Sequence, residues 1–586
     1  MKENFSETKQ NNLYNILHLH VTPTTDLSGT NIAAGTTSLF SLNRRQKSIT
    51  FFFLFLTSLL VYRNCYDIRI PTDSFSFLLI VKNYGVSGLL HNYYSIGLAL
   101  VADTVFLLGY NLFGSSTIGW FLSAMFFHSL NALLILLISL RLFVSFSVPG
   151  NFTLALFAAL LFLLSPYQTE VLLWTPRIIN YVIAGTFILL SVYYMIKYSQ
   201  NEKRTDLILF HVSFILATLS FETSLSFPAI PACYFILYRF IHRQSLKIKN
   251  ILLNIVLPQA IILFMYFLTC KLWLGNWILH YGAKIHLDFS FSLAMGNTIK
   301  YLAKFFLLYR YLPASRHEFL HDILHTDISN NYTIWLFAVA TISLTGFLFY
   351  RSFSINKQNA TLLLFLFLAF LIMLIPVINL DTTFLGAVFS DRYGYLPSTF
   401  FYLFLSVFIY LLFKKAGGYV CAGLLIVNFV CLSATIPLWN EASDYSKRLI
   451  HNFIPHMSEQ NIYVLNMPDN YNWIMTYRNG FASTSEFIYE KKLKHLNEIS
   501  GFYMTSPGDS VKVTRNDSLS FLVESMPARK SFLSKGTWAK SYETDSYSVS
   551  FSENLSSFTI TFKDKIPDNA AMFYVAGDQW RKVKVR

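Results

Sequence analysis

Long apolar runs limit what this chain can fold into more than any other feature. Runs at 51–62, 178–196 and 360–378 contain almost no charge. An α-helix needs about 20 predominantly apolar residues to cross the hydrocarbon core of a bilayer. Of the 586 residues, 54% are apolar and 13% are charged, whereas a typical soluble domain carries about 25% charged residues. The sequence therefore predicts a mainly α-helical, polytopic membrane protein.

The apolar pattern predicts about eleven crossings. The two segments around Ser220–Ser224 are short, so we expect them to be tilted or broken there. Two further stretches, 93–113 with Asp103 and the basic-faced 293–311, are interpreted as interfacial helices. The predicted crossings are 47–64, 117–142, 151–167, 178–197, 206–221, 223–240, 251–272, 332–350, 360–379, 396–413 and 417–438.

The distribution of basic residues sets the orientation. The connections 197–206, 239–250, 351–358 and 414–415 contain eleven Lys or Arg and two acids. With eleven crossings they all fall on one side, which the positive-inside rule makes cytoplasmic. The other side receives the loops 64–116, 166–177, 273–331 and 380–395 and everything after residue 438.

The two ends of the chain differ from the middle. Residues 1–43 are polar and are interpreted as a mobile cytoplasmic tail, before a membrane domain at 44–438. Residues 439–586 are predicted to be a small β-rich extracytoplasmic domain with a helix near 480–494. Its strings of alternating polarity, bounded by Pro, Gly, Asn or Asp, are NIYVLNM, SVKVT, SLSFLV, YSVSFS, FTITFK and AMFYVAG.

Several classes of function are disfavoured. The formal charge of +14 comes from Lys and Arg clustered in short connections, so nucleic-acid binding is not expected. The five cysteines have no spacing typical of a metal site or a disulfide framework. Metalloprotease, P-loop and nucleophile-elbow patterns are absent. We therefore expect neither a metal nor an organic cofactor.

Three carboxylates are candidate site residues, because charges beside the hydrocarbon core are costly. Asp73 in IPTDSF could act as a general base, or it could cap a helix. Glu170 in SPYQTEVLLW could orient a sugar hydroxyl, or it could pair with Arg177. Glu222 lies between two apolar segments. It could bind a substrate, or it could be a hydrated side chain that is merely tolerated at a turn. All three are predicted on the non-cytoplasmic face.

The segment SDRYGYLPS supplies the candidate basic group. Arg392, with Tyr395, suits a phosphate because a guanidinium donates bidentate charge-assisted hydrogen bonds. The alternative is a structural Asp391–Arg392 pair. His128 and Asn131 lie one turn apart within a predicted crossing, and interhelical hydrogen bonds explain them better than a metal.

Five segments, in order, resemble the membrane portion of the GT-C superfamily of glycosyltransferases, above all the TMTC-type protein O-mannosyltransferases and their bacterial relatives. They cover roughly residues 47–438. They are the acidic first loop with Asp73, NLFGSSTIGWFLSAMFFHSLNALLILL, SPYQTEVLLWTPRIINYVIAGTFILLSVYYMIKY, ATLSFETSLSFPAI and FSDRYGYLPSTFF.

This resemblance implies an inverting enzyme that takes a sugar from a polyprenyl-phosphate donor on the non-cytoplasmic face. The acceptor would be a glycan, a lipid or a protein. Asp73 would be the base and Arg392, with Tyr395, would bind the donor phosphate. Glu170, Arg177, Glu222 and Asp391 would bind substrate. The modest length, the near-absence of cysteines on the outer side and the lack of a tetratricopeptide array favour a bacterial inner membrane, with the C-terminal domain outside the cytoplasm.

The chain also departs from the family's pattern. Asp73 has no acidic neighbour, the family's Arg after the first loop is missing at Tyr93–Ile96, and Phe221 stands where the family has Lys. An inactive homologue therefore stays open as an alternative. So do an O-antigen polymerase or ligase, a transporter and a non-catalytic scaffold that presents the C-terminal domain.

Overall fold

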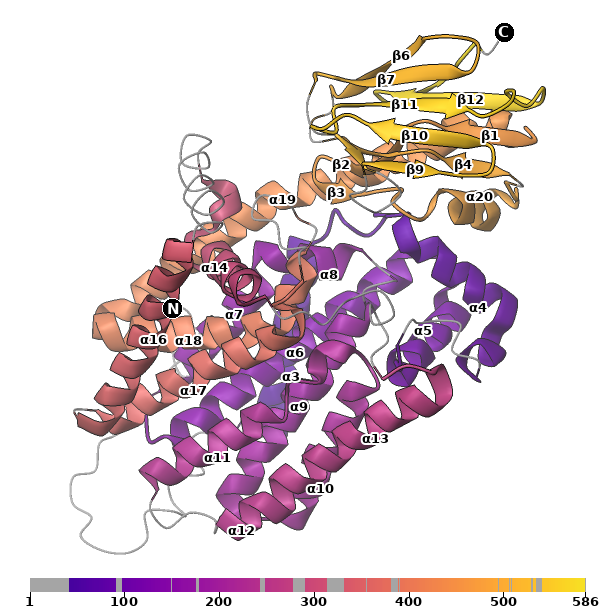
Figure 1. Cartoon of the computed structure of the whole chain (residues 1–586). Helices are drawn as coiled ribbons and strands as arrows, with labels where there is room; N and C mark the ends of the chain where they lie inside the picture. Colours follow the sequence, from indigo (N-terminus) through magenta and orange to yellow (C-terminus); the bar gives the residue numbers. More distant parts are fainter. Residues whose placement is uncertain are drawn as a thin grey trace, which may run out of the picture. The chain divides into compact units, whose positions relative to one another are not determined.

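The computed structural model describes residues 42–586 except 91–96, 149, 175, 177–178, 243–247, 278–289, 313–330, 355, 381–387, 389, 494, 505, 507, 529–530, 534–539 and 585–586. The expected tail at 1–43 lies almost wholly outside this range. Residues 42–586 form one compact unit. Helices make up its first part and strands dominate its C-terminal part (Figure 1).

The helices of the first part follow the apolar runs. They are α3 (Arg44–Val61), α4 (Thr72–Leu90), α5 (Leu100–Phe113), α6 (Thr117–Ser145), α7 (Phe152–Leu163), α8 (Thr169–Leu173), α9 (Ile179–Asn201), α10 (Arg204–Thr218), α11 (Ala229–Ile241), α12 (Ile248–Ile251), α13 (Leu257–Leu274), α14 (Phe291–Leu307), α16 (Asn331–Ser354), α17 (Lys357–Leu374), α18 (Tyr395–Phe413) and α19 (Gly417–Phe453). Short 3-10 turns η2 (Glu222–Ser224), η4 (Tyr309–Tyr311) and η7 (Asp391–Gly394) lie between them.

By length and composition alone, six helical stretches among the described residues could cross a membrane, or seven if the bent pair α7–α8 is one span. This is compatible with a multi-pass membrane protein but is fewer than the eleven predicted. The differences have visible causes. Helix α3 has three basic residues among its first four, α10 has only 15 residues, and the stretch 391–456 joins α18 to α19. The predicted break near residue 220 is present, since α10 ends at Thr218 and η2 follows.

Polar side chains tie the buried helices together. The Asn131 amide of α6 donates to the Val182 carbonyl of α9 and to the Tyr395 hydroxyl of α18, both at 3.0 Å. His128 Nδ1 lies 3.0 Å from the same hydroxyl. The predicted interhelical role of His128 and Asn131 is therefore confirmed.

The connections predicted to share the cytoplasmic side also share contacts. Arg141 Nη1 donates to Gln200 Oε1 at 2.7 Å, and the Gln200 amide donates to Ser145 Oγ at 2.9 Å. His242 Nε2 lies 2.7 Å from the Ser145 carbonyl oxygen. The ends of α6, α9 and α11 thus meet.

Helix α19 links the two parts of the chain. Its 37 residues span about 55 Å at 1.5 Å per residue, which exceeds the roughly 30 Å of a bilayer core. The predicted crossing ended at residue 438, whereas the helix continues to Phe453. Its last turns pack into the β-rich part, where the Phe453 and Phe573 rings lie 5.3 Å apart.

Among its described residues, the β-rich part contains three sheets and the helix α20 (Phe481–Tyr489). Their orders are β13-β12-β1-β4, β3-β2-β5-β8 and β6-β7-β11-β10-β9. All six predicted strands and the predicted helix are present. The strands are β1 (Asn461–Val464), β2 (Met467–Tyr471), β3 (Ile474–Met475), β4 (Leu496–Glu498), β5 (Gly501–Met504), β6 (Ser510–Arg515), β7 (Ser520–Met526), β8 (Phe532–Leu533), β9 (Ser541–Glu543), β10 (Tyr547–Phe551), β11 (Ser557–Phe562), β12 (Ala570–Ala576) and β13 (Gln579–Lys582).

Candidate functional site

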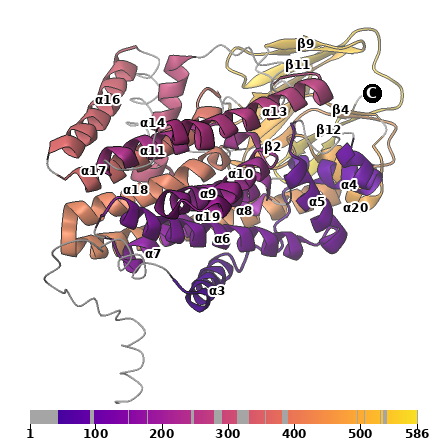
Figure 2. The ribbon, with the colours of Figure 1, turned by 90° about the horizontal axis from the view of Figure 1, so that it is seen from below.

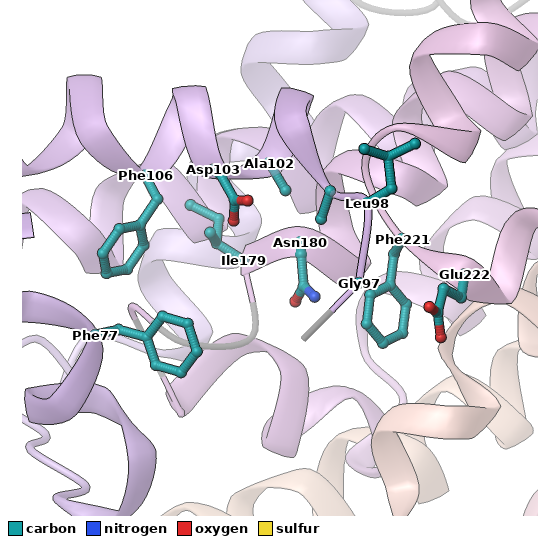
Figure 3. A pocket seen from close by; sticks show the side chains of 11 residues that line it. Phe77, Gly97, Leu98, Ala102, Asp103, Phe106, Ile179, Asn180, Phe221 and Glu222 are labelled. Atoms are coloured by element: carbon teal, nitrogen blue, oxygen red, sulfur yellow. The ribbon is translucent and has the colours of Figure 1, made fainter. Parts of the chain in front are cut away.

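Helices α4, α5 and α9 and the turn η2 surround a small hollow that opens to solvent and encloses about 30 Å³ (Figure 3). Asp103, Asn180 and Glu222 supply its polar groups. Aromatic rings of Phe77, Phe106 and Phe221 and several small apolar side chains form the rest of its wall. Carboxylates and amides beside aromatic faces can hold a polar ligand that also has apolar edges, which is the chemistry of a sugar ring.

Glu222 reaches the hollow because the chain breaks between α10 and α11. It is the first residue of η2 and is partly exposed. A methyl group placed on Gly97 would meet Glu222 Oε1 at 2.6 Å. The carboxylate therefore lies directly against the backbone of Gly97, and the absence of a side chain there makes room for it.

Asp103 is a site residue that the sequence analysis missed. It lies in the first turn of α5 and is 8% exposed. In the sequence, Asp103 counts against a crossing at 93–113, so that this stretch is interpreted as interfacial. The sequence feature that indicates Asp103 is the same one that indicates Glu222, namely an acid within an apolar segment. Helix α5 begins at Leu100, and the preceding residues 91–96 lie outside the described range.

Asp73 lies in the first turn of α4, where a negative charge is favourable near the helix N-terminus. It is the second residue of the helix, not the residue before it. Phe77, which lines the hollow, follows four positions later. Side chains four apart on a helix are about 5–6 Å apart. Asp73 is therefore one turn from the wall of the hollow, although its own side chain does not line it.

Glu170 and Arg392 form a buried ion pair that joins positions 222 apart in the sequence. Glu170 Oε2 accepts from the backbone N–H of Arg392 at 2.7 Å, and Glu170 Oε1 binds Arg392 Nη1. Glu170 is 1% exposed and the Arg392 side chain 16%. Arg177, the other predicted partner of Glu170, lies outside the described residues.

Arg392 is also held by aromatic rings. Its guanidinium lies 4.5 Å from the Tyr393 ring centroid and 5.4 Å from the Trp174 centroid. The Tyr181 ring lies 6.4 Å from Tyr393 and 4.2 Å from Phe221, a wall residue of the hollow. A row of rings thus connects Arg392 to the hollow.

Asp391 belongs to a separate charged group. Its Oδ1 accepts from Lys304 Nζ at 2.7 Å and its Oδ2 from Arg310 Nη2 at 2.6 Å. All three side chains are buried. The stretch 293–311 is interpreted from the sequence as an interfacial helix with a basic face, and the structure shows that Asp391 holds Lys304 and Arg310 of this face inside the protein.

The structure therefore brings together only some of the predicted site residues. Glu170 and Arg392 are in direct contact, and Glu222 and Asp103 line one hollow. The Tyr395 hydroxyl is buried and contacts His128 and Asn131. The Asp391 carboxylate forms ion pairs with both Lys304 and Arg310. Among the described residues, no group of three His, Cys, Asp or Glu side chains is arranged to hold a metal ion.

Arg392 also interacts electrostatically with a residue of the C-terminal domain, Arg478. Arg478 donates to both carboxylate oxygens of Asp469, at 2.8 and 2.7 Å. Burial lowers the pKa of Arg478. The hydrogen bond and the charge of Asp469 outweigh burial and raise this pKa above its usual value, whereas the positive charge of Arg392 lowers it. The two guanidiniums are thus close enough to influence each other.

The sequence matches no model of a protein family, and no curated protein is similar to it. The site has to be interpreted from its own geometry.

Proposed function

We propose that this chain is a membrane glycosyltransferase that moves a sugar from a polyprenyl-phosphate donor to a glycan, lipid or protein acceptor. The observation that carries the proposal is the hollow, where two carboxylates and an amide face three aromatic rings one helical turn from Asp73. The sugar would bind at the open side of this hollow, where Asp103, Asn180 and Glu222 would bond to its hydroxyl groups.

The proposal includes the eleven-crossing orientation, with the site and residues 439–586 on the non-cytoplasmic side of a bacterial inner membrane. Contacts between α4 and the C-terminal domain support it. The Thr72 N–H donates to the Thr476 carbonyl at 2.7 Å, so residue 72 and this domain lie on the same side. The contacts among the ends of α6, α9 and α11 support the placement of these ends together on the cytoplasmic side.

The reaction would be a direct displacement with inversion. Asp73 takes the proton of an acceptor hydroxyl while that oxygen attacks the anomeric carbon. The bond from this carbon to the donor phosphate oxygen breaks, and its electron pair leaves with the polyprenyl phosphate. Arg392 would stabilise the departing phosphate by its positive charge, and its guanidinium would have to share its present bonds to Glu170 and to the Tyr393 hydroxyl. Glu170 would hold that guanidinium in place, so we now assign Glu170 to positioning.

Glu222→Gln is expected to lower sugar transfer about 10- to 100-fold, because a hydrogen bond to a charged group contributes roughly 1.5–3 kcal/mol. Gly97→Ala should do the same, since its methyl group displaces the Glu222 carboxylate. The control is Gly423→Ala, where a methyl group meets nothing within 4 Å.

The assay uses membrane vesicles from a strain that lacks the chain and is complemented with each variant. A panel of polyprenyl-phosphate hexoses and pentoses, tritiated in the sugar, is supplied, and label in glycan, lipid and protein fractions is counted. Wild type and Gly423→Ala should transfer label from one member of the panel. Transfer that does not depend on the chain would refute the proposal.

A non-catalytic scaffold is the second candidate, and one observation favours it. The Arg392 guanidinium is already bound to Glu170, so a phosphate would have to share it. A scaffold predicts that Glu222→Gln and wild type complement a deletion strain equally well.

A further inference from the structure

Helix α4 is fastened to the C-terminal domain near Asp73. Besides the bond from Thr72 to Thr476, Ser76 Oγ donates to Ser483 Oγ at 2.9 Å. Helices α4 and α20 lie side by side in both views (Figures 1 and 2). The helix that carries the proposed base is thus attached to a part of the chain about 400 residues later.

Asn479 contacts Asp73 itself. Its Nδ2 donates to Asp73 Oδ1 at 3.3 Å. A donor on one carboxylate oxygen restricts rotation of the carboxylate about its last side-chain bond. Asn479 comes from the turn between β3 and α20, so the C-terminal domain influences the orientation of Asp73.

Gly480 follows Asn479 and makes this approach possible. A methyl group at Gly480 would lie 2.1 Å from the Thr72 carbonyl oxygen and 2.8 Å from its Cα. These are backbone atoms, which cannot rotate away as a side chain can. Glycine is therefore required here for close approach of two backbones.

Apolar contacts extend the attachment to the hollow. The Phe487 ring of α20 lies 5.6 Å from Phe75 of α4. Phe487 and Ile488 pack against a cluster that includes Phe106 and Ile179, which also line the hollow. The same helix of the C-terminal domain thus supports the wall of the proposed sugar site.

A second attachment lies before α4. The Arg69 N–H donates to Ser443 Oγ of α19 at 2.8 Å, and Lys447 Nζ lies 2.7 Å from Asp67 Oδ2. Burial alone would raise the pKa of Asp67, but the hydrogen bond and charge of Lys447 lower it below its usual value. The start of the first loop, residues 67–76, is therefore held by the chain beyond residue 438.

We infer that the Asn479–Gly480 turn positions Asp73 for sugar transfer, so that the docked C-terminal domain is part of the working enzyme. Asn479 is a positioning residue that acts through Asp73, and Gly480 allows the contact. The inference rests on the proposed function.

Gly480→Ala tests the contact. It is expected to lower transfer about 100-fold, since misplacing a catalytic group by 1 Å costs about that much. Gly508→Ala is the matched control in the same domain, because a methyl group there meets nothing within 4 Å. Equal activity of Gly480→Ala and Gly508→Ala would overturn the inference.

Asn479→Ala separates positioning from a general loss of structure. It should lower kcat about 10-fold and leave KM for the labelled donor unchanged, because the base acts only in the chemical step. Asn479→Gln keeps the amide donor and should restore part of kcat. A fall in the amount of folded protein, with kcat per folded molecule unchanged, would make Asn479 merely structural.

A cross-link tests whether the docked arrangement is the working one. Ser76→Cys with Ser483→Cys places two thiols where the hydroxyl oxygens are 2.9 Å apart, close enough for a disulfide after small adjustment. The oxidised protein should transfer sugar at the wild-type rate. Full inactivation on oxidation, reversed by reductant, would show instead that the domain must detach during the reaction.

The cross-link also distinguishes two kinds of failure. Its yield is measured by thiol labelling, and it should fall in Gly480→Ala whether or not the chain is an enzyme. Loss of cross-linking without any transfer by wild type would refute the proposed function. Unchanged cross-linking and transfer in Gly480→Ala, with Asp73→Asn inactive, would refute only the inference.

Discussion

Asp391→Asn is expected to destabilise the protein more than any other single change in the charged groups, by about 3–5 kcal/mol. The substitution removes the carboxylate that Lys304 and Arg310 share and leaves two buried cations facing an amide. Lys304 is fully buried, so water cannot replace the lost charge.

The loss of stability is measured by heating the purified chain in detergent and following the monodisperse fraction with temperature. Lys304→Met should be milder, because Arg310 still neutralises Asp391. The variant that combines Asp391→Asn with Lys304→Met should lose less stability than the sum of the two single losses, since the two side chains interact directly. Asp564→Asn, at an exposed position, is the control. Equal melting of Asp391→Asn and Asp564→Asn would contradict the buried network.

Asp73→Asn is expected to lower sugar transfer by about 100-fold or more, because general base catalysis contributes 10²–10⁴-fold. Asparagine has nearly the same shape and can still accept the hydrogen bond from Asn479. The chain should therefore fold, keep its docked C-terminal domain and bind the donor. What it loses is a group able to take the proton of the acceptor.

Binding and catalysis are measured separately. The KM for the labelled donor should stay near the wild-type value while kcat falls. Glu222→Gln should show the opposite balance, with a larger effect on KM, because Glu222 lines the hollow. If Asp73→Asn transferred sugar at the wild-type rate, the base would have to be another group, and Asp103 would be the first to test.

The sequence predicted those elements whose pattern is local. Apolar runs located most of the helices, and alternation of polarity located β6, β7, β10 and β11. The short strands β2, β3 and β5 were missed. Met467–Tyr471 contains Pro468 and Asp469, which are rare in strands, and it is buried throughout. Its strand conformation depends on pairing with β5 and β3.

The site was harder to predict because its contacts are distant in sequence. An ion pair with Arg177 was one of two alternatives for Glu170, and the partner that the structure describes is Arg392. Lys304 was placed on the basic face of an interfacial helix, because nothing near it in sequence reveals Asp391. Asp103 and Glu222 meet at one hollow only after α5 and η2 have packed. An acid in an apolar segment therefore identifies a candidate, but its role follows from the fold.

The most direct test of the sugar-transferase assignment is mass spectrometry of envelope glycans, lipids and proteins from a deletion strain complemented with wild type, Asp73→Asn or Asp564→Asn. We predict that the deletion strain lacks one monosaccharide on one class of acceptor. Wild type and Asp564→Asn should restore it, and Asp73→Asn should not. Identical glycans in the deletion strain and the parent would contradict the assignment, and restoration by Asp73→Asn would exclude Asp73 as the base.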